Sequence, residues 1–429
     1  MKGALASSVD IKVDLQVRCC IVGGGPAGMM LGFLLARAGI EVLVFEKHAD
    51  FLRDFRGDTL HPSTLELMHD LGLVDQLLRL PHQQLTQLRA HIGAEEFVMA
   101  DLSRLPTSYK FLALMPQWDF LTFIEQQARR YPTFQLTMQA EVIGVLQQDD
   151  RVTGVQVKTP AGLQNIGAQL VVAADGRNSI LRNHPSLKVE DLGAPMDALW
   201  VRLSHKPADP STALRFDCGK ILVMIDRGSY WQCAFVIRKG DYEEMRSKGL
   251  DSLRADIVEI APFLHDRVGE LQAWEQVKLL SVRVDRLHQW YRPGLLCIGD
   301  AAHAMSPVGG VGINLAIQDA VAAANKLVEP LRKGMITVDC LAEIQKRRMF
   351  ATRLTQRFQV LIHKHLIVRV LATSGRVTLP FPALLGLRSK FLSRIRGRMM
   401  GIGLRPERIR TPDAYAGTCR TSLRGRSRD

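Results

Sequence analysis

The sequence predicts an α/β fold with an α+β insert: a mainly parallel sheet flanked by helices, an inserted antiparallel sheet, and C-terminal helices. Three observations predict this fold. A short apolar run enters a glycine-rich turn at 23–28, and a helix-like run leaves it. Two further apolar runs, 168–174 and 295–298, lead into Asp-Gly or Gly-Asp, as strands buried on both faces of a sheet do. Between them, strands that alternate polar and apolar residues occupy much of 192–285.

The glycine-rich turn has the spacing of a dinucleotide-binding site. Gly23, Gly25 and Gly28 follow the G-x-G-x-x-G pattern. One such glycine makes the tight turn, one lets the backbone approach a pyrophosphate, and one lets helix and strand pack closely. The pyrophosphate then binds N–H groups at the N-terminus of the following helix, which we expect at about 29–38.

An acidic residue follows where such a Rossmann-like site needs one. The next strand, 40–46, ends in Glu46, which lies 18 residues after Gly28, about where an acid binds a ribose hydroxyl. The alternative is a structural glycine turn with a surface glutamate. The predicted site consists of Gly23, Gly25, Pro26, Ala27, Gly28, Glu46 and Lys47.

Length and composition indicate an ordinary globular protein of two or three domains. The chain has 429 residues, of which 47% are hydrophobic and 23% charged. It has no apolar stretch long enough to span a membrane, and residues 1–17 lack the apolar core of a signal peptide, so we expect a cytoplasmic protein. Its seven cysteines form no C-x-x-C pair and no Cys/His cluster, so we expect reduced thiols and no metal site.

The predicted elements follow in chain order. A helix runs from Ser63 to about Leu71, and another begins at Gln117 and reaches Arg130. Antiparallel strands are expected at 134–145 and 152–158, with a turn at 149–150. The insert contains strands at 198–203, 214–226, 230–237 and 277–284 and a helical stretch at 241–271; the C-terminal region contains helical segments at 343–371 and 381–398. The expected domains are a discontinuous first domain at 14–190 and 276–345, a substrate-binding domain at 191–275, a helical region at 346–410, and flexible tails at 1–13 and 411–429.

The C-terminal end carries most of the net charge of +13, because residues 388–429 contain twelve Arg and Lys against three acidic residues. Within 381–398 these basic residues alternate with Leu and Phe, as in a helix that lies on the inner, anionic face of a membrane. The preferred interpretation is a helix docked on the protein with a solvated basic face. Nucleic acid is a poorer partner, since aromatic residues are few here and no binding motif accompanies the charge. The segment 343–371 is expected to provide helix packing or homodimer contacts.

Three further positions are suited to a bound cofactor. Arg56 precedes the helix at 63, and Gln117 begins the next one, where each side chain can reach a ligand or remain at the surface. Asp175 ends a buried strand, at the edge where open α/β sheets bind ligands, although it is also an ordinary turn residue. The glycine-rich loop at 306–315 opens a helix whose N–H groups can stabilise negative charge.

These motifs together resemble the single-component (class A) FAD-dependent aromatic hydroxylases, the group that includes para-hydroxybenzoate hydroxylase and the ubiquinone-pathway hydroxylases. The resemblance rests on Gly23-x-Gly25-x-x-Gly28, Asp175-Gly176-x-x-Ser179, and Gly299-Asp300-Ala301-Ala302-His303 followed by Pro307. It covers about the first 330 residues, with the motifs in the expected order.

The resemblance implies roles for these positions. The first glycines and Glu46 would hold the ADP half of FAD, and Asp300 the ribityl chain or pyrophosphate. Asp175 would lie in a region shared by FAD and NAD(P)H, and His303 would be structural. The remaining implied flavin contacts are Arg56, Gln117, Gly299, Pro307, Gly312, Ile313 and Asn314.

The implied reaction is a monooxygenation. NADPH or NADH reduces FAD, the reduced flavin adds O2, and a C4a-hydroperoxide transfers one oxygen atom to an electron-rich substrate. The expected substrate is hydrophobic, and aromatic or quinone- or polyketide-like. Candidate lining residues are Trp200, Arg202, Arg215, Phe216, Tyr230, Trp231 and Phe235, only about half of which can point inward from alternating strands. The catalytic group is not identified; Pro307, Tyr230 and Arg215 are weak candidates.

Three alternatives share or reuse the predicted fold. Flavin-dependent halogenases carry a Trp-x-Trp-x-Ile-Pro motif, which Tyr230-Trp231-Gln232 does not supply. Isoprenoid reductases of the geranylgeranyl type reduce double bonds without oxygen, and the glycine-rich loop does not exclude them. A non-catalytic flavin-binding sensor or interaction protein is a candidate from another class. Oxygen uptake and product mass separate the enzymes, and a flavin that NAD(P)H never reduces would indicate the sensor.

Overall fold

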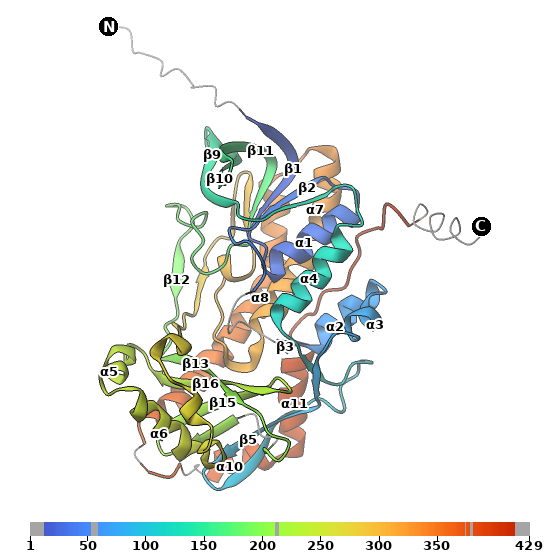
Figure 1. Cartoon of the computed structure of the whole chain (residues 1–429). Helices are drawn as coiled ribbons and strands as arrows, with labels where there is room; N and C mark the ends of the chain where they lie inside the picture. The colour runs from blue at the N-terminus through green and yellow to red at the C-terminus, as the bar shows by residue number, and fades with distance from the viewer. Residues whose placement is uncertain (1–12, 53–58, 211–213, 374, 378–380, 417–429) are drawn as a thin grey trace, which may run out of the picture.

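The computed structural model describes residues 13–52, 59–210, 214–373, 375–377 and 381–416, and its two large sheets lie at opposite ends of the molecule (Figure 1). The first sheet has the order β19-β20-β11-β1-β2-β8, in which β20 to β8 are parallel. Its strands are β1 (Leu15–Val22), β2 (Val42–Phe45), β8 (Phe134–Thr137), β11 (Gly162–Ala173), β19 (Tyr291–Arg292) and β20 (Leu295–Cys297). The hairpin of β9 (Glu141–Gln148) and β10 (Arg151–Thr159) extends from β11.

The parallel strands are apolar throughout because both faces of this sheet are covered. On one face, alternate residues such as Ile21 and Val172 pack against the helices α1 (Pro26–Arg37), α4 (Gln117–Ala128) and α7 (Gly312–Lys333). On the other face, Cys20 and Val171 pack against the β9–β10 hairpin and Trp290. The carboxyl ends of these strands point toward the middle of the molecule, where the glycine-rich turn lies (Figure 1).

The second sheet has the order β17-β13-β16-β15-β14-β5-β6. Its strands are β5 (Gln87–Ile92), β6 (Glu95–Asp101), β13 (Met196–Ser204), β14 (Leu214–Asp217), β15 (Lys220–Asp226), β16 (Tyr230–Arg238) and β17 (Lys278–Leu280). The helices α5 (Tyr242–Ser247) and α6 (Leu250–Ile260) and three short turns cover one face, and the other face looks toward the first sheet. The pair β5–β6 comes from a segment that the sequence places in the first domain, and β17 lies beyond residue 275, so the second sheet draws on more of the chain than 191–275.

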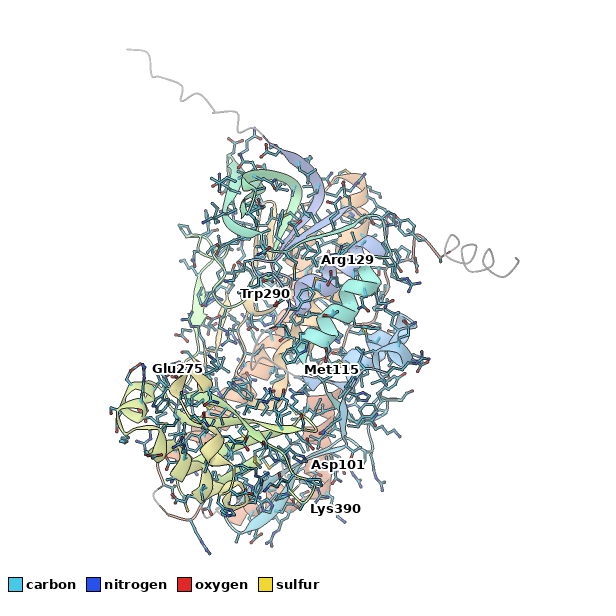
Figure 2. All side chains as sticks on the ribbon, in the orientation of Figure 1. Asp101, Met115, Arg129, Glu275, Trp290 and Lys390 are labelled. Carbon is cyan, nitrogen blue, oxygen red and sulfur yellow. The ribbon has the colours of Figure 1, made fainter. Side chains whose placement is uncertain are left out.

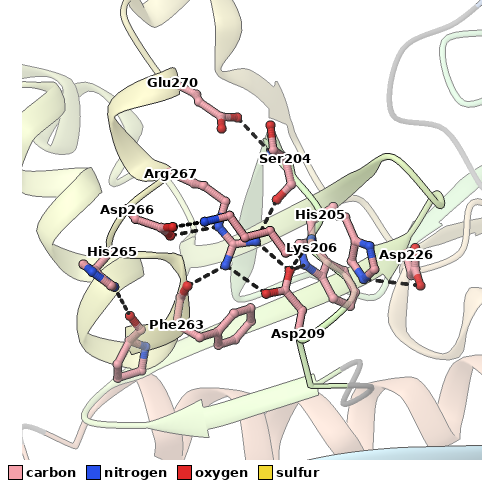
Figure 3. A network of polar contacts seen from close by, with 12 residues as sticks. Ser204, His205, Lys206, Asp209, Asp226, Phe263, His265, Asp266, Arg267 and Glu270 are labelled. Atoms are coloured by element: carbon pink, nitrogen blue, oxygen red, sulfur yellow. Dashed lines mark hydrogen bonds and ion pairs between the residues drawn. The ribbon is translucent and has the colours of Figure 1, made fainter.

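A buried ion pair fastens the covered face of the second sheet. Arg267 donates to both carboxylate oxygens of Asp209 over 2.6 and 2.9 Å (Figure 3). The indole N–H of Trp231 donates to Asp209 over 2.7 Å. Burial alone would raise the pKa of Asp209, but these bonds hold it well below its usual range. The loop after β13 is thereby tied to the turns after α6.

Smaller elements connect the two sheets. A three-stranded sheet consists of β3 (Thr59–Leu60), β7 (Leu112–Leu114) and β4 (Gln83–Leu85), and β12 (Val189–Asp191) pairs with β18 (Asp285–Leu287). The helices are α2 (Pro62–Asp70) and α3 (Val74–Leu77), then α8 (Val338–Ile362), a π-helical turn (His363–Ile367), α9 (Val368–Leu371), α10 (Phe381–Arg388) and α11 (Lys390–Gly401). In the described part of the chain no helix is long and apolar enough to cross a membrane, and no described cysteine forms a disulfide.

Several predicted boundaries were wrong. The single strand expected at 134–145 is two strands, because β8 joins the parallel sheet and the chain then turns to start β9. The segment 214–226 is a hairpin, β14–β15, and 277–284 forms only the short β17. Residues 411–416 are not a free tail: Ala414 N–H donates to the carbonyl of Arg37 over 2.9 Å, and the Arg37 side chain donates to the carbonyl of Thr411. The turn at Asp149-Asp150 between β9 and β10 was predicted correctly.

Candidate functional site

A cavity of about 1390 Å³ lies between the two sheets. At one end it is lined by the turn between β1 and α1 and by the loop before α7. At the other end it is lined by the second sheet and by residues of α8, α10 and α11. The cavity therefore joins every predicted cofactor motif to the predicted substrate domain.

The three glycines differ in their surroundings, as the three expected roles require. A Cβ on Gly23, whose φ is +106°, would lie 2.5 Å from the carbonyl oxygen of Ala174, and one on Gly28 would lie 1.9 Å from that of Gly23. A Cβ on Gly25 would meet nothing within 4 Å, and Gly25 lines the cavity. Gly23 and Gly28 are thus required by packing. Gly25 leaves open space at the N-terminus of α1, where no side chain caps the helix.

Glu46 stands beside this turn at the end of β2. Its Oε2 accepts from the N–H of Gly24 over 3.0 Å, and its Oε1 accepts from the N–H of His48 over 3.1 Å. The carboxylate is thereby fixed at the cavity wall, next to Lys47. An uncapped helix N-terminus, open space at Gly25 and a fixed acid make a set that fits the ADP half of FAD.

Two acids from separate strand ends lie at the same side of the cavity. Asp300, in the turn after β20, pairs with Arg177 at 3.4 Å between Oδ2 and Nη2. Burial raises the pKa of Asp175 to about 6, although nearby backbone N–H groups and the charge of Arg182 act in the opposite direction. The sequence motifs mark both acids but not Arg177, which occupies an unspecified position of the Asp-Gly-x-x-Ser motif.

The loop at 306–311 is held by the C-terminal helices. Gln359 of α8 accepts from the N–H of Ser306 over 3.1 Å and donates to the carbonyls of Ser306 and Val308 over 2.9 Å. His363, in the π-helical turn, lies 2.8 Å from the Oγ of Ser306. Pro307 and residues 309–313 line the cavity, and no side chain caps the N-terminus of α7. These contacts hold the start of the loop in place, and N–H groups at the N-terminus of α7 can stabilise negative charge at this wall.

Asn314 also lines the cavity, and its side chain has a clear structural role. Its Oδ1 accepts from the hydroxyls of Ser63 and Thr64 over 2.9 and 2.8 Å, which ties α7 to the start of α2. Gln117, at the start of α4, lines the cavity. Arg56 lies outside the described residues.

Behind the cavity wall, His303 belongs to a buried ionic cluster. Its Nε2 lies 2.6 Å from Asp319 Oδ2, and Asp319 Oδ1 accepts from Arg348 Nε over 2.9 Å. Burial alone would raise the pKa of Asp319, but the adjacent His303 and Arg348 lower it. His303 does not line the cavity, which supports its interpretation as a structural residue.

The second sheet contributes an apolar wall, and strand alternation decides which aromatic residues belong to it. Trp200 and Phe216 line the cavity. Trp231 and Phe235 point to the opposite face and pack against α6 and its neighbours. The wall also includes Leu88 and Ile92 of β5, Met196, Ala198, Leu214, Val223, Ala234 and Val236.

Neither Arg215 nor Tyr230 lies among the residues that line the cavity. Arg215 is on the covered face of the sheet, with its guanidinium 5.2 Å from the centre of the Phe263 ring. Tyr230 and Arg202 stack at 3.7 Å in a separate recess at the end of the sheet. Of the three weak catalytic candidates, Pro307, Tyr230 and Arg215, only Pro307 therefore lines the cavity.

Comparison with known proteins gives consistent matches. The family model described as "FAD binding domain" matches residues 16–357. The 6-methylpretetramide 4-monooxygenase of Streptomyces rimosus is 30% identical over 361 residues, which cover 84% of this chain and 85% of that protein. The para-nitrophenol 4-monooxygenase of a Pseudomonas strain is 24% identical over 344 residues, 74% of this chain and 79% of that protein.

Solved structures share the fold. Pseudomonas aeruginosa PqsL in complex with 2-aminobenzoylacetate has a TM-score of 0.70 at 21% identity, covering 83% of this chain and 98% of that chain. Pseudomonas putida p-nitrophenol 4-monooxygenase has a TM-score of 0.71 at 19% identity, covering 90% and 95%.

Proposed function

This chain belongs to the FAD-binding family of class A monooxygenases, and on that premise we propose that it hydroxylates an extended, apolar aromatic compound of the polyketide class. It is an FAD-dependent oxidoreductase, and NAD(P)H is the family's usual electron donor. The substrate class rests on one observation above all. The cavity continues from the glycine-rich loop along an apolar wall that includes Trp200 and Phe216.

The chain's own residues account for cofactor binding. We propose that Gly25 and the N-terminus of α1 bind the pyrophosphate, that Glu46 binds the ribose, and that Asp300 binds the chain between pyrophosphate and ring. When bound, the flavin supplies the redox chemistry and the activation of O2. Pro307 and the loop to Asn314 would lie along the ring, where free N–H groups stabilise negative charge.

The apolar wall supports the choice of substrate. Apolar side chains exclude water, and they stabilise flat apolar ligands by burial and by ring stacking. The family relative from Streptomyces rimosus is named for a pretetramide substrate, which favours a polycyclic compound over a single ring. Membrane contact and a homodimer stay predictions, as does the choice between NADH and NADPH.

The substrate class can be tested by stimulation of NAD(P)H oxidation. The flavin-loaded protein is mixed with NADPH or NADH, O2 and a panel of phenols with one to four fused rings. We expect three- and four-ring compounds to accelerate oxidation most, with formation of a product that contains one more oxygen atom. Equal stimulation by small, charged phenols, with none by fused-ring compounds, would contradict the proposed substrate class.

A further inference from the structure

Helix α11 packs on β6 through its smallest residues, and this fixes which side it turns outward. Ser393, Gly397 and Gly401 recur every four residues, are buried, and form one face. A Cβ on Gly397 would lie 2.0 Å from the carbonyl oxygen of Asp101, and one on Gly401 would lie 2.6 Å from Leu105. The helix can approach β6 this closely only with that face inward. Figure 2 shows Asp101 and Lys390 together at this end of the molecule.

Part of the outward face is apolar, which is unusual for a surface helix. Phe391 is 70% exposed, and Leu392 and Ile395 are each 40% exposed. Leu385 of α10 is 63% exposed, and the two helices meet where Leu392 lies 3.9 Å from the Cβ position of Gly386. We call these four residues, Leu385, Phe391, Leu392 and Ile395, the apolar patch. Several exposed apolar side chains on two adjoining helices mark an interaction site more often than isolated surface leucines do.

Basic residues flank the apolar patch, and no acidic residue occurs between 384 and 401. Arg396 is half-buried and donates to the carbonyls of Met99 and Gly386. It therefore links α11 to β6 and α10. Lys390, Arg394 and Arg398 recur every four residues along the exposed part of α11. Apolar residues that can enter a lipid layer, next to basic residues that attract its headgroups, are the mark of an interfacial helix.

The inner side of the same two helices lines the cavity. Leu387, Arg396, Met399 and Met400 contribute to its wall. The α10–α11 pair thus separates the cavity from the exterior and presents apolar side chains in both directions. A second copy of the chain is a poor occupant of the apolar patch, because a symmetric contact would bring the same basic residues together.

We propose that α10 and α11 dock on an anionic lipid surface, with the apolar patch inserted between the headgroups and Lys390, Arg394 and Arg398 contacting lipid phosphates. This docking does not depend on the proposed hydroxylation, since it uses residues on the outer face of the helices. It places the wall of the cavity against the lipid layer, where apolar compounds concentrate.

The test is flotation of the flavin-loaded protein with vesicles. One set contains phosphatidylcholine alone, and the other contains about 30% phosphatidylserine. We expect binding to the anionic set, with about tenfold or greater weakening in Phe391→Asp/Ile395→Asp and in Arg394→Glu/Arg398→Glu. Leu163→Asp and Lys158→Glu are matched controls. Both residues are exposed and pair with each other on β10 and β11, in the first sheet, and both variants should bind as the wild type does.

Three outcomes would overturn the proposal. They are no binding of the wild type to anionic vesicles, equal binding to both vesicle types, or patch variants that bind normally. Light scattering in lipid-free buffer measures the molar mass, and so tests whether a second copy of the chain covers the apolar patch. If the wild type is a dimer that Phe391→Asp/Ile395→Asp converts to a monomer, then the patch is a protein interface. Flavin content and melting temperature should stay unchanged in all variants, which separates lost docking from misfolding.

Discussion

Asp319 in α7 binds His303 and the backbone N–H of Gly299 through the same carboxylate oxygen, at 2.6 and 3.1 Å. These two partners are the first and last residues of the Gly299-to-His303 motif. Asp300, which faces the cavity, lies between them. A single buried carboxylate therefore fixes the loop that presents a proposed cofactor ligand, and Arg348 neutralises the same carboxylate from the other side.

Replacement of Asp319 by asparagine should destabilise the protein and release flavin. The neutral amide would leave buried His303 and Arg348 without their carboxylate, and breaking a buried ion pair costs about 3–5 kcal/mol. Urea unfolding measures the loss, and absorbance measures flavin per protein. Asp339→Asn, at an exposed position in the first turn of α8, is the control and should change neither.

The lowered pKa of Asp319 also predicts how the stability of the protein depends on pH. The pKa of Asp319 is lowered in the folded state, so its contribution is complete above the unfolded value of about 3.9 and is lost as pH falls through the lower folded value. Wild-type stability should therefore fall more steeply below about pH 4 than that of Asp319→Asn. Parallel acid profiles of the two proteins would exclude this contribution.

Asp175 should have the opposite effect. Burial raises its pKa to about 6, so ionisation costs stability as pH rises from the unfolded value of about 3.9 through the folded value. Asp175→Asn should match the wild type near pH 4 and be more stable near pH 7.5, by up to about 3 kcal/mol in the flavin-free protein. Urea titrations at the two pH values check this. A difference that does not change with pH would mean that Asp175 is solvated.

The glycines of the first turn should separate folding from cofactor binding. Gly25→Val adds a side chain to open space, so the flavin-free protein should keep its stability within about 0.5 kcal/mol while losing most of its FAD. Gly28→Ala would collide with the backbone of Gly23 and should unfold the domain. Melting curves and flavin absorbance distinguish the two effects. Full FAD occupancy in Gly25→Val would contradict the proposal that the pyrophosphate binds at this turn.

The two faces of the second sheet should respond differently to substitution. Trp200→Ala enlarges the cavity and removes a stacking surface, so the KM for a fused-ring substrate should rise about tenfold or more. Tyr230→Phe, in the separate recess, should leave kcat and KM unchanged. Steady-state kinetics decide both. A large loss of kcat in Tyr230→Phe would restore that residue as a catalytic candidate.

The sequence was most informative where the site depends on local chain geometry. The glycine turn and the strand ends at Glu46, Asp175 and Asp300 are set by short segments, and each of them contributes to the cavity wall. Contacts between distant segments were missed. Gln359 and His363 hold the loop at 306 from more than 50 residues away, and no local pattern marks them.

Strand pairing and register in the second sheet could not be predicted from the sequence either. The pair β5–β6 reaches it through parallel pairing of β5 with β14, across more than 100 residues of sequence. Alternation could show that about half of its aromatic residues face inward, but not which half. A shift of one residue in register exchanges the two faces, and only the structure assigned Trp200 and Phe216 to the cavity.

The proposed hydroxylation is tested most directly by following isotopically labelled O2 into the product. The flavin-loaded protein is supplied with NAD(P)H and the best fused-ring substrate of the panel under labelled O2, and the product is examined by mass spectrometry. We expect one labelled oxygen atom per product molecule and about one NAD(P)H consumed for each. A product that forms equally well without O2, or one whose new oxygen comes from water, would contradict it.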